Sequence, residues 1–203
     1  MQKRYSIPLG VTLGAAAILP ANAGELTVKV QLPEFTTGQY VRPYLAVWLE
    51  KADGTFVQTL ALWHEVKDKR GNPLTNGDKY LKIMRNWWGK SGATPDMKFD
   101  GISSATRPSG EYELVFTEGK APLNTLPPGK YQLMLEVARE VKAGRTAAPN
   151  ARPEDLDQNG RPKKVDVDEP QAPISFEWPA KQITTIESHG KVEMGKYSLV
   201  VKP

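Results

Sequence analysis

The chain has 203 residues, a formal net charge of +4 and no cysteine. The lack of cysteine excludes disulfide bonds, thiolate metal ligands and thiol catalysis. A short basic start, an uncharged apolar run and "ANA" at 21–23 are typical of a secretory signal peptide. We therefore expect cleavage after Ala23, a mature chain of residues 24–203 and a bacterial periplasmic location. Lys3 and Arg4 belong to this leader, so the basic charge does not indicate nucleic-acid binding.

No segment is predicted to stay in a membrane after cleavage. The apolar run of the leader is too short, and too rich in glycine and alanine, to form a stable anchor. No later stretch is apolar enough to span a bilayer. The mature chain is long enough for one domain with a substantial core.

Alternating apolar and polar residues predict strands along most of the mature chain. The first is expected at 25–32. A denser apolar run at 42–50 and a strand at 56–64 flank an Asp-Gly turn, which indicates a β-hairpin. Turn residues separate the remaining predicted strands, which lie at 112–116, 130–140, 174–179 and 191–203.

One segment follows helical spacing. Asp78 is a candidate N-cap and Gly89 a stop signal, and between them Leu81, Met84 and Trp88 recur at helical intervals. Seven or eight strands with one short helix predict a mostly all-β protein. We expect an antiparallel β-sandwich of immunoglobulin-like or transthyretin-like type.

Residues 141–173 have little apolar content and five prolines. This composition predicts a flexible insertion between strands, within a single β-sandwich domain that spans residues 24–203.

Catalytic patterns are mostly absent. The two histidines, His64 and His189, have no second histidine at metal-binding spacing, and both are expected to be solvated or capping residues. The sequence has no nucleophile elbow, phosphate-binding loop or dinucleotide-binding loop. We therefore expect no catalytic activity of the protein's own.

A calcium-loop pattern occurs in "DLDQNGRPKKVD". Asp155, Asp157, Asn159, Gly160 and Asp166 fall at the loop positions that supply oxygen ligands and the sharp bend. Three basic side chains inside the loop oppose a cation: Arg161, Lys163 and Lys164. No amphipathic helix flanks the loop. The alternative is a polar Asn-Gly turn, and we expect no metal site.

The stretch "FDGISSATRPSGEY" at 99–112 contains a second motif. Asp100 stands six residues before Thr106, and Ser103, Ser104 and Ala105 precede the threonine directly. This spacing resembles the acceptor motif of proteins modified by the exported FMN transferase, which joins FMN through its phosphate to the threonine hydroxyl. The resemblance implies covalent FMN on Thr106.

Neighbouring residues fit that hypothesis. Arg107 is placed to neutralise the phosphate, and Pro108 with the following turn predicts that the loop stands clear of the sheet. Ser104 stands where the motif usually has glycine. A second candidate acceptor, Thr94, follows a better glycine but has Trp88 in place of the aspartate.

Longer stretches resemble one bacterial family. They are "RPYLAVWLEKADGTFVQTLALW", "YLKIMRNWW", "DGISSATRPSGEYELVF" and "LPPGKYQLMLEVARE". Over roughly residues 25–140 and the final strand, the chain resembles the predicted periplasmic family catalogued as domain of unknown function 2271. That resemblance implies an exported, flavin-carrying electron-transfer module, with the FMN transferase and a PepSY-type membrane reductase as partners.

Aromatic residues and rival functions complete the expectations. Trp87 and Trp88 are adjacent on the predicted helix, so one should point outward and could contact flavin. The other large aromatics are expected mostly in the core: Trp48, Trp63, Trp178 and Tyr112. The rivals to the flavin hypothesis are a cofactor-free periplasmic binding or assembly module and a calcium-dependent adhesion domain.

Overall fold

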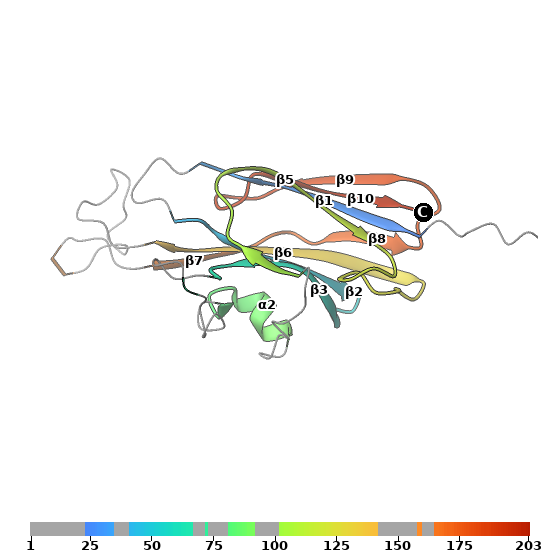
Figure 1. The fold of residues 1–203 in the computed structure, drawn as a ribbon, viewed down its shortest axis with the longest axis horizontal. Helices are drawn as coiled ribbons and strands as arrows, with labels where there is room; N and C mark the ends of the chain where they lie inside the picture. The colour runs from blue at the N-terminus through green and yellow to red at the C-terminus, as the bar shows by residue number, and fades with distance from the viewer. Residues whose placement is uncertain are drawn as a thin grey trace, which may run out of the picture.

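The computed structural model describes residues 23–34, 41–66, 72, 81–91, 102–141, 158–159 and 165–203. These residues form two β-sheets packed face to face, with a short helix, α2, on the outer side of one of them (Figure 1). The predicted β-sandwich with one short helix is confirmed. No helix in this part of the chain is long and apolar enough to cross a membrane.

Sheet A has four antiparallel strands in the order β5-β1-β10-β9. They are β1 (Glu25–Leu32), β5 (Gly110–Thr117), β9 (Thr184–His189) and β10 (Lys196–Lys202). The strand predicted at 25–32 matches β1. The final strand begins later than expected, at 196 rather than 191, and β9 was not predicted. Most side chains of β9 are exposed, so its sequence "TTIESH" carries little apolar alternation.

Sheet B has six strands, five of them in the order β4-β3-β2-β6-β7. They are β2 (Tyr44–Lys51), β3 (Phe56–His64), β4 (Ser103–Ala105), β6 (Gly129–Val141), β7 (Val165–Pro170) and β8 (Ile174–Trp178). The predicted hairpin is confirmed, because β2 and β3 pair in antiparallel. Gly54 in its turn has a φ of 82°, a left-handed conformation that favours glycine.

Strand β7 differs from the expectation for residues 141–173, which were predicted to be a flexible insertion. β6 has 13 residues, and β8 pairs only with its first part, from Gly129 to Leu133. The later part, from Glu136 onward, pairs with β7. The open edge of β6 therefore gives residues 165–170 a hydrogen-bonding partner that composition alone does not reveal. Of residues 142–164, only 158 and 159 are described.

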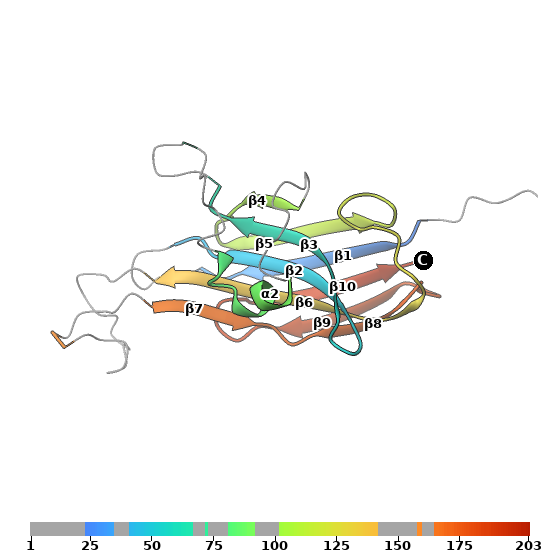
Figure 2. The same ribbon diagram turned by 90° about the horizontal axis from the view of Figure 1, so that it is seen from below.

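Two apolar layers hold the molecule together. The larger lies between the sheets and contains Trp63 and Trp178, and the smaller lies between sheet B and α2 and contains Trp48 and Trp87. In Figure 2, α2 lies across the outer face of sheet B, over its middle strands. The burial of Trp48, Trp63 and Trp178 confirms their predicted place in the core.

Helix α2 (Arg85–Lys90) is shorter than predicted and shifted along the chain. Gly89 lies inside it rather than after it, and Asp78 lies outside the described residues. Met84 occupies the N-cap position without a side-chain capping bond. The first N–H groups are instead bound by Glu136 of β6, so a distant strand, not a local cap, sets where the helix begins.

Candidate functional site

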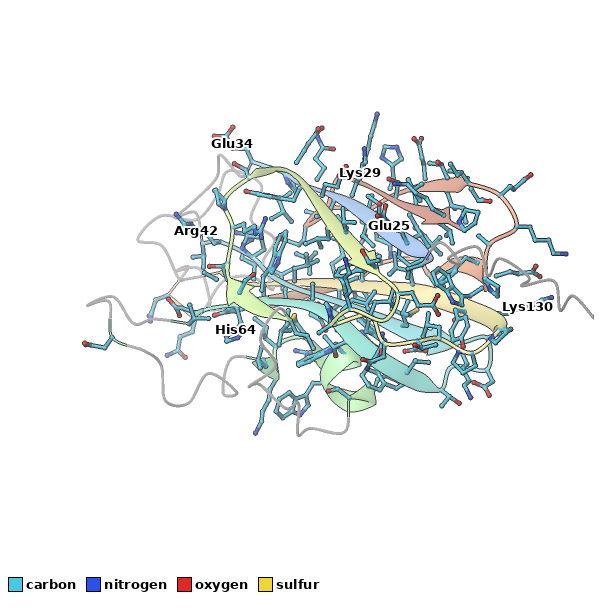
Figure 3. The ribbon with its side chains drawn as sticks, turned by 45° about the vertical axis from the view of Figure 1, so that its right-hand side comes forward. Glu25, Lys29, Glu34, Arg42, His64 and Lys130 are labelled. Carbon is cyan, nitrogen blue, oxygen red and sulfur yellow. The ribbon has the colours of Figure 1, made fainter. Side chains whose placement is uncertain are left out.

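Thr106 lies where the chain leaves the edge of sheet B and crosses to sheet A. Strand β4 ends at Ala105 in sheet B, and β5 begins at Gly110 in sheet A. Residues 106–109, called the crossing segment below, join the two sheets. Figure 3 shows His64 at this end of the sandwich and Lys130 at the opposite end.

The backbone before Thr106 belongs to the sheet, contrary to the prediction that the loop stands clear of it. β4 pairs in parallel with residues 62–64 of β3. The N–H of Leu62 donates to the carbonyl of Ile102 at 2.8 Å, and the N–H of Thr106 donates to the carbonyl of His64 at 3.2 Å. The reason is that the edge of β3 presents backbone N–H and carbonyl groups, and the backbone of residues 102–106 forms hydrogen bonds with them.

The predicted acceptor residues are partly described. Thr106 and Ser104 are half-buried and Ala105 is exposed. Within the described residues, no protein group hydrogen-bonds the Thr106 hydroxyl. Asp100 lies outside the described residues, and of Ser103 only the backbone is described. The alternative acceptor, Thr94, also lies outside them.

The Arg107 side chain is held against two aromatic rings. Its guanidinium carbon lies 4.4 Å from the centre of the Trp63 ring and 5.1 Å from that of Tyr112. The rings meet edge to face, with centroids 5.3 Å apart. Such contacts use the face of the guanidinium and leave its N–H edge able to bind an anion. Positive charge is therefore fixed beside Thr106.

Tyr112 also anchors the crossing segment. Its hydroxyl donates to the carbonyl of Pro108 at 2.8 Å, four residues upstream. Tyr131 makes the same contact with the carbonyl of Pro127, at 2.7 Å. Both tyrosines are the third residue of their strand and end a Pro-x-Gly-x-Tyr sequence. This repeated spacing is a sequence signal for both anchors, and the strand pattern alone missed it.

The two histidines differ in environment. His64 is buried at the end of β3, so of the two expectations, a solvated or a capping histidine, the first is wrong for it. Burial lowers the pKa of His64, although a contact between Nδ1 and the carbonyl of Glu65 acts the other way. His189 is exposed at the end of β9. Neither belongs to a group of three or more potential metal ligands in the described part of the chain.

The calcium-loop residues are mostly undescribed. Asp155, Asp157 and Gly160 lie outside the described residues, and Asn159 is exposed. Asp166 lies in β7, where its backbone pairs with residue 140. The absence of a calcium site therefore stays a prediction.

Buried charges join the sheets at the end where Thr106 lies. Arg139 of β6 and Glu193, from the turn between β9 and β10, form an ion pair through two contacts of 2.8 and 2.9 Å. Glu169 of β7 accepts hydrogen bonds from the N–H groups of residues 191–193. Since each charge has specific partners, this cluster is best explained as structural.

A groove of about 310 Å³ crosses the outer face of sheet A. Lys29 and Glu113 line it and pair at 3.1 Å, and His189 lies on its far side. Its lining includes none of the predicted FMN-acceptor residues.

Comparison with known families identifies the chain. A family model described as "predicted periplasmic protein (DUF2271)" matches residues 25–158, which include the crossing segment and all of β1 to β6. Searches among curated proteins and among solved structures gave no match. Because the matched residues make up more than half of the chain, the protein belongs to this periplasmic family, the domain of unknown function 2271.

Proposed function

We propose that this periplasmic protein carries FMN covalently on Thr106 and acts as an electron-transfer module. The observation that supports this most is a hydroxyl with no hydrogen-bond partner among the described residues, next to a cation that is held in place. Thr106 is half-buried at the sandwich edge, and Arg107, the next residue, is held against Trp63 and Tyr112.

The attachment would be a phosphoester between Thr106 Oγ1 and the FMN phosphate, formed when the hydroxyl loses its proton and displaces a leaving group from an activated FMN donor bound to the transferase. Arg107 would then neutralise the phosphate through its N–H groups, while Trp63 and Tyr112 keep the guanidinium in place. The flavin supplies two-electron and one-electron redox chemistry, and the protein supplies attachment and orientation. The sandwich itself needs no catalytic residue for this role.

The backbone around Thr106 fits modification by another enzyme. Its N–H is bound to His64, so the threonine is held at a fixed place on the sheet edge. The side chains before it, Ser104 and Ala105, are small and leave room for a transferase to approach. We assign Asp100 a part in recognition by the exported FMN transferase. A PepSY-type membrane reductase is the proposed electron donor or acceptor.

The visible absorption spectrum tests this function directly. The protein is exported with and without a co-expressed FMN transferase, purified and then denatured in acid. We expect flavin bands that stay with the denatured chain only when the transferase is present. A colourless protein in both cases would contradict the proposal and favour the cofactor-free binding or assembly module.

A further inference from the structure

A buried carboxyl group on sheet B holds the start of α2. Glu136 of β6 is fully buried. Its Oε1 accepts hydrogen bonds from the backbone and side-chain nitrogens of Asn86, at 2.9 and 3.0 Å, and its Oε2 accepts one from the N–H of Trp87 at 2.7 Å. The first N–H groups of a helix have no partner within it, so Glu136 provides their partner from across the layer.

A second carboxyl group lies beside Glu136. Asp168 of β7 pairs with Ala138, the next outward-facing residue of β6, and its Oδ2 accepts a hydrogen bond from the N–H of Arg85 at 3.4 Å. The Oδ1 of Asp168 is buried without a partner in the described part of the chain. Glu136 and Asp168 lie on the same face of neighbouring strands and accept hydrogen bonds from the consecutive N–H groups of Asn86 and Arg85, so their carboxyl groups lie close together. Carboxylates only accept hydrogen bonds, so a hydrogen bond between the two groups requires a proton on one of them.

The environment places this proton near neutral pH. Burial, the hydrogen bond to Asp168 and the charge of Asp168 raise the pKa of Glu136 from 4.5 to about 7, and the N–H groups of Trp87 and Asn86 oppose the rise. The protonated form is thus the one that fits the closed layer at mildly acidic pH.

The other charges of this layer lie apart from the pair. Lys90, at the end of α2, contacts Glu50 of β2 at 3.3 Å. Lys82 lies 5.5 Å from the centre of the Trp88 ring, and Arg85 is exposed. In the described part of the chain no basic side chain forms an ion pair with Glu136 or Asp168. No counter-charge there compensates for loss of the shared proton.

We propose that Glu136 and Asp168 form a proton-operated clasp for α2. With the shared proton, the pair holds the helix on sheet B. When the proton leaves to solvent, two adjacent carboxylates, one fully buried and one half-buried, repel each other, and α2 loosens. The apolar face beneath it, which includes Tyr44, Trp48 and Leu62, would then become accessible. This inference does not depend on the proposed function.

The direction with pH follows from the raised pKa. Glu136 binds its proton more tightly in the closed state than in the open one, where the pKa returns toward 4.5. Its stabilising contribution is therefore complete below about pH 4.5 and is lost as the pH rises through about 7. The clasp is closed in mild acid and loosens in mild base.

The substitution Glu136→Gln imitates the protonated form. Glutamine carries no charge at either pH and has almost the same volume, and it keeps one of the two acceptor oxygens that bind Asn86 and Trp87. Asp168→Asn is the second variant, because its amide can donate to a charged Glu136. Glu50→Gln is the matched control, since it weakens the opposite end of α2, at Lys90, without touching the carboxyl pair.

Hydrogen exchange of the peptide over residues 81–91, in the mature chain at pH 6 and pH 8, tests the clasp. After correction for intrinsic exchange rates, we expect the protection factors of the wild type to fall about tenfold from pH 6 to pH 8. This is the change that follows from a Glu136 pKa of about 7 in the closed state and 4.5 in the open state. Glu136→Gln should remove this pH difference and Asp168→Asn should reduce it. Glu50→Gln should lower protection at both pH values and leave the difference between them unchanged. Equal wild-type protection at both pH values would overturn the proposal, as would a tenfold difference that persists in both pair variants.

Discussion

Arg107 lies over the ring of Trp63, with its guanidinium carbon 4.4 Å from the ring centre. Trp63 belongs to the buried core and Arg107 to the crossing segment, so this contact attaches the crossing segment to the core between the two sheets. The guanidinium of Arg107 also contacts the ring of Tyr112, which belongs to β5 of the other sheet. The local order of Thr106 therefore depends on tertiary contacts made by its neighbour.

Substitution of Arg107 should weaken the fold measurably. For Arg107→Lys we expect a loss of about 1 kcal/mol in the free energy of unfolding, because lysine lacks the planar group that lies on the rings. Urea unfolding measures this loss. Lys82→Arg is the control, since Lys82 lies farther from its ring, at 5.5 Å, and should change stability little. Equal stability of Arg107→Lys and the wild type would contradict the assigned role.

The two tyrosine anchors allow a paired test. Tyr112→Phe and Tyr131→Phe should each cost about 1 kcal/mol in urea unfolding, because each removes one hydrogen bond to a proline carbonyl. Only Tyr112→Phe should also slow flavin attachment, since only its partner, Pro108, lies in the crossing segment. If the rate of flavin attachment fell by the same factor in both variants, it would depend on the overall stability of the fold and not on the Tyr112 anchor.

Glu169 should make the protein sensitive to acid. Burial alone would raise the pKa of Glu169, but hydrogen bonds from Gln171 and from the N–H groups of residues 191–193 outweigh it and hold the pKa below 4.5. Its stabilising contribution is then present above about pH 4.5 and is lost as the pH falls further. We expect Glu169→Gln to be less stable at pH 7 and to lose less stability between pH 5 and pH 3. Melting curves across this range would show the difference, and parallel curves for both proteins would contradict it.

Calcium should have almost no effect on melting temperature. Three basic side chains lie within the loop pattern, Arg161, Lys163 and Lys164, and they oppose a divalent cation. Calorimetry in millimolar calcium and in a chelator measures the shift. A rise of several degrees that Asp157→Ala removes would establish the site that we do not expect.

Sequence patterns predicted the elements whose hydrogen bonds and burial are local or strongly periodic. The alternation in residues 25–32 predicts strand β1, and the turn at Asp53 and Gly54 predicts the hairpin of β2 and β3. The limits of α2 could not be predicted in this way, because Glu136 lies 50 residues from Asn86 in sequence and binds the start of the helix. Strand β4 has only three residues and forms because β3 leaves an open edge beside it.

The candidate site shows the same division. The acceptor spacing and the role of Thr106 were predicted from sequence, as was a positive charge at Arg107. The contacts of Arg107 with Trp63 and Tyr112 were not, because they join residues from both sheets. The burial of His64 was also missed, since a histidine at the end of an apolar strand carries no signal of which face it lies on.

Variants around the acceptor refine the proposed attachment. Asp100→Ala should reduce the yield of labelled protein without unfolding the domain, because a loop carboxylate contributes little to a sandwich core. Ser104→Gly should label as well as the wild type or better, as it restores the usual motif. Intact mass and a melting curve on each variant separate loss of recognition from loss of fold. Full labelling of Asp100→Ala would remove that residue from the recognition motif.

Intact-mass measurement of Thr106→Val, exported together with an FMN transferase, tests the central claim most directly. Valine keeps the shape of threonine and lacks the oxygen that forms the phosphoester, whereas Thr106→Ser keeps a hydroxyl and should retain some label. We predict that the wild type gains the mass of one FMN less one water, on the peptide that contains "ISSATRPSGEY", and that Thr106→Val gains nothing. A Thr106→Val protein that still carries the added mass, or a wild type that never acquires it, would contradict the account.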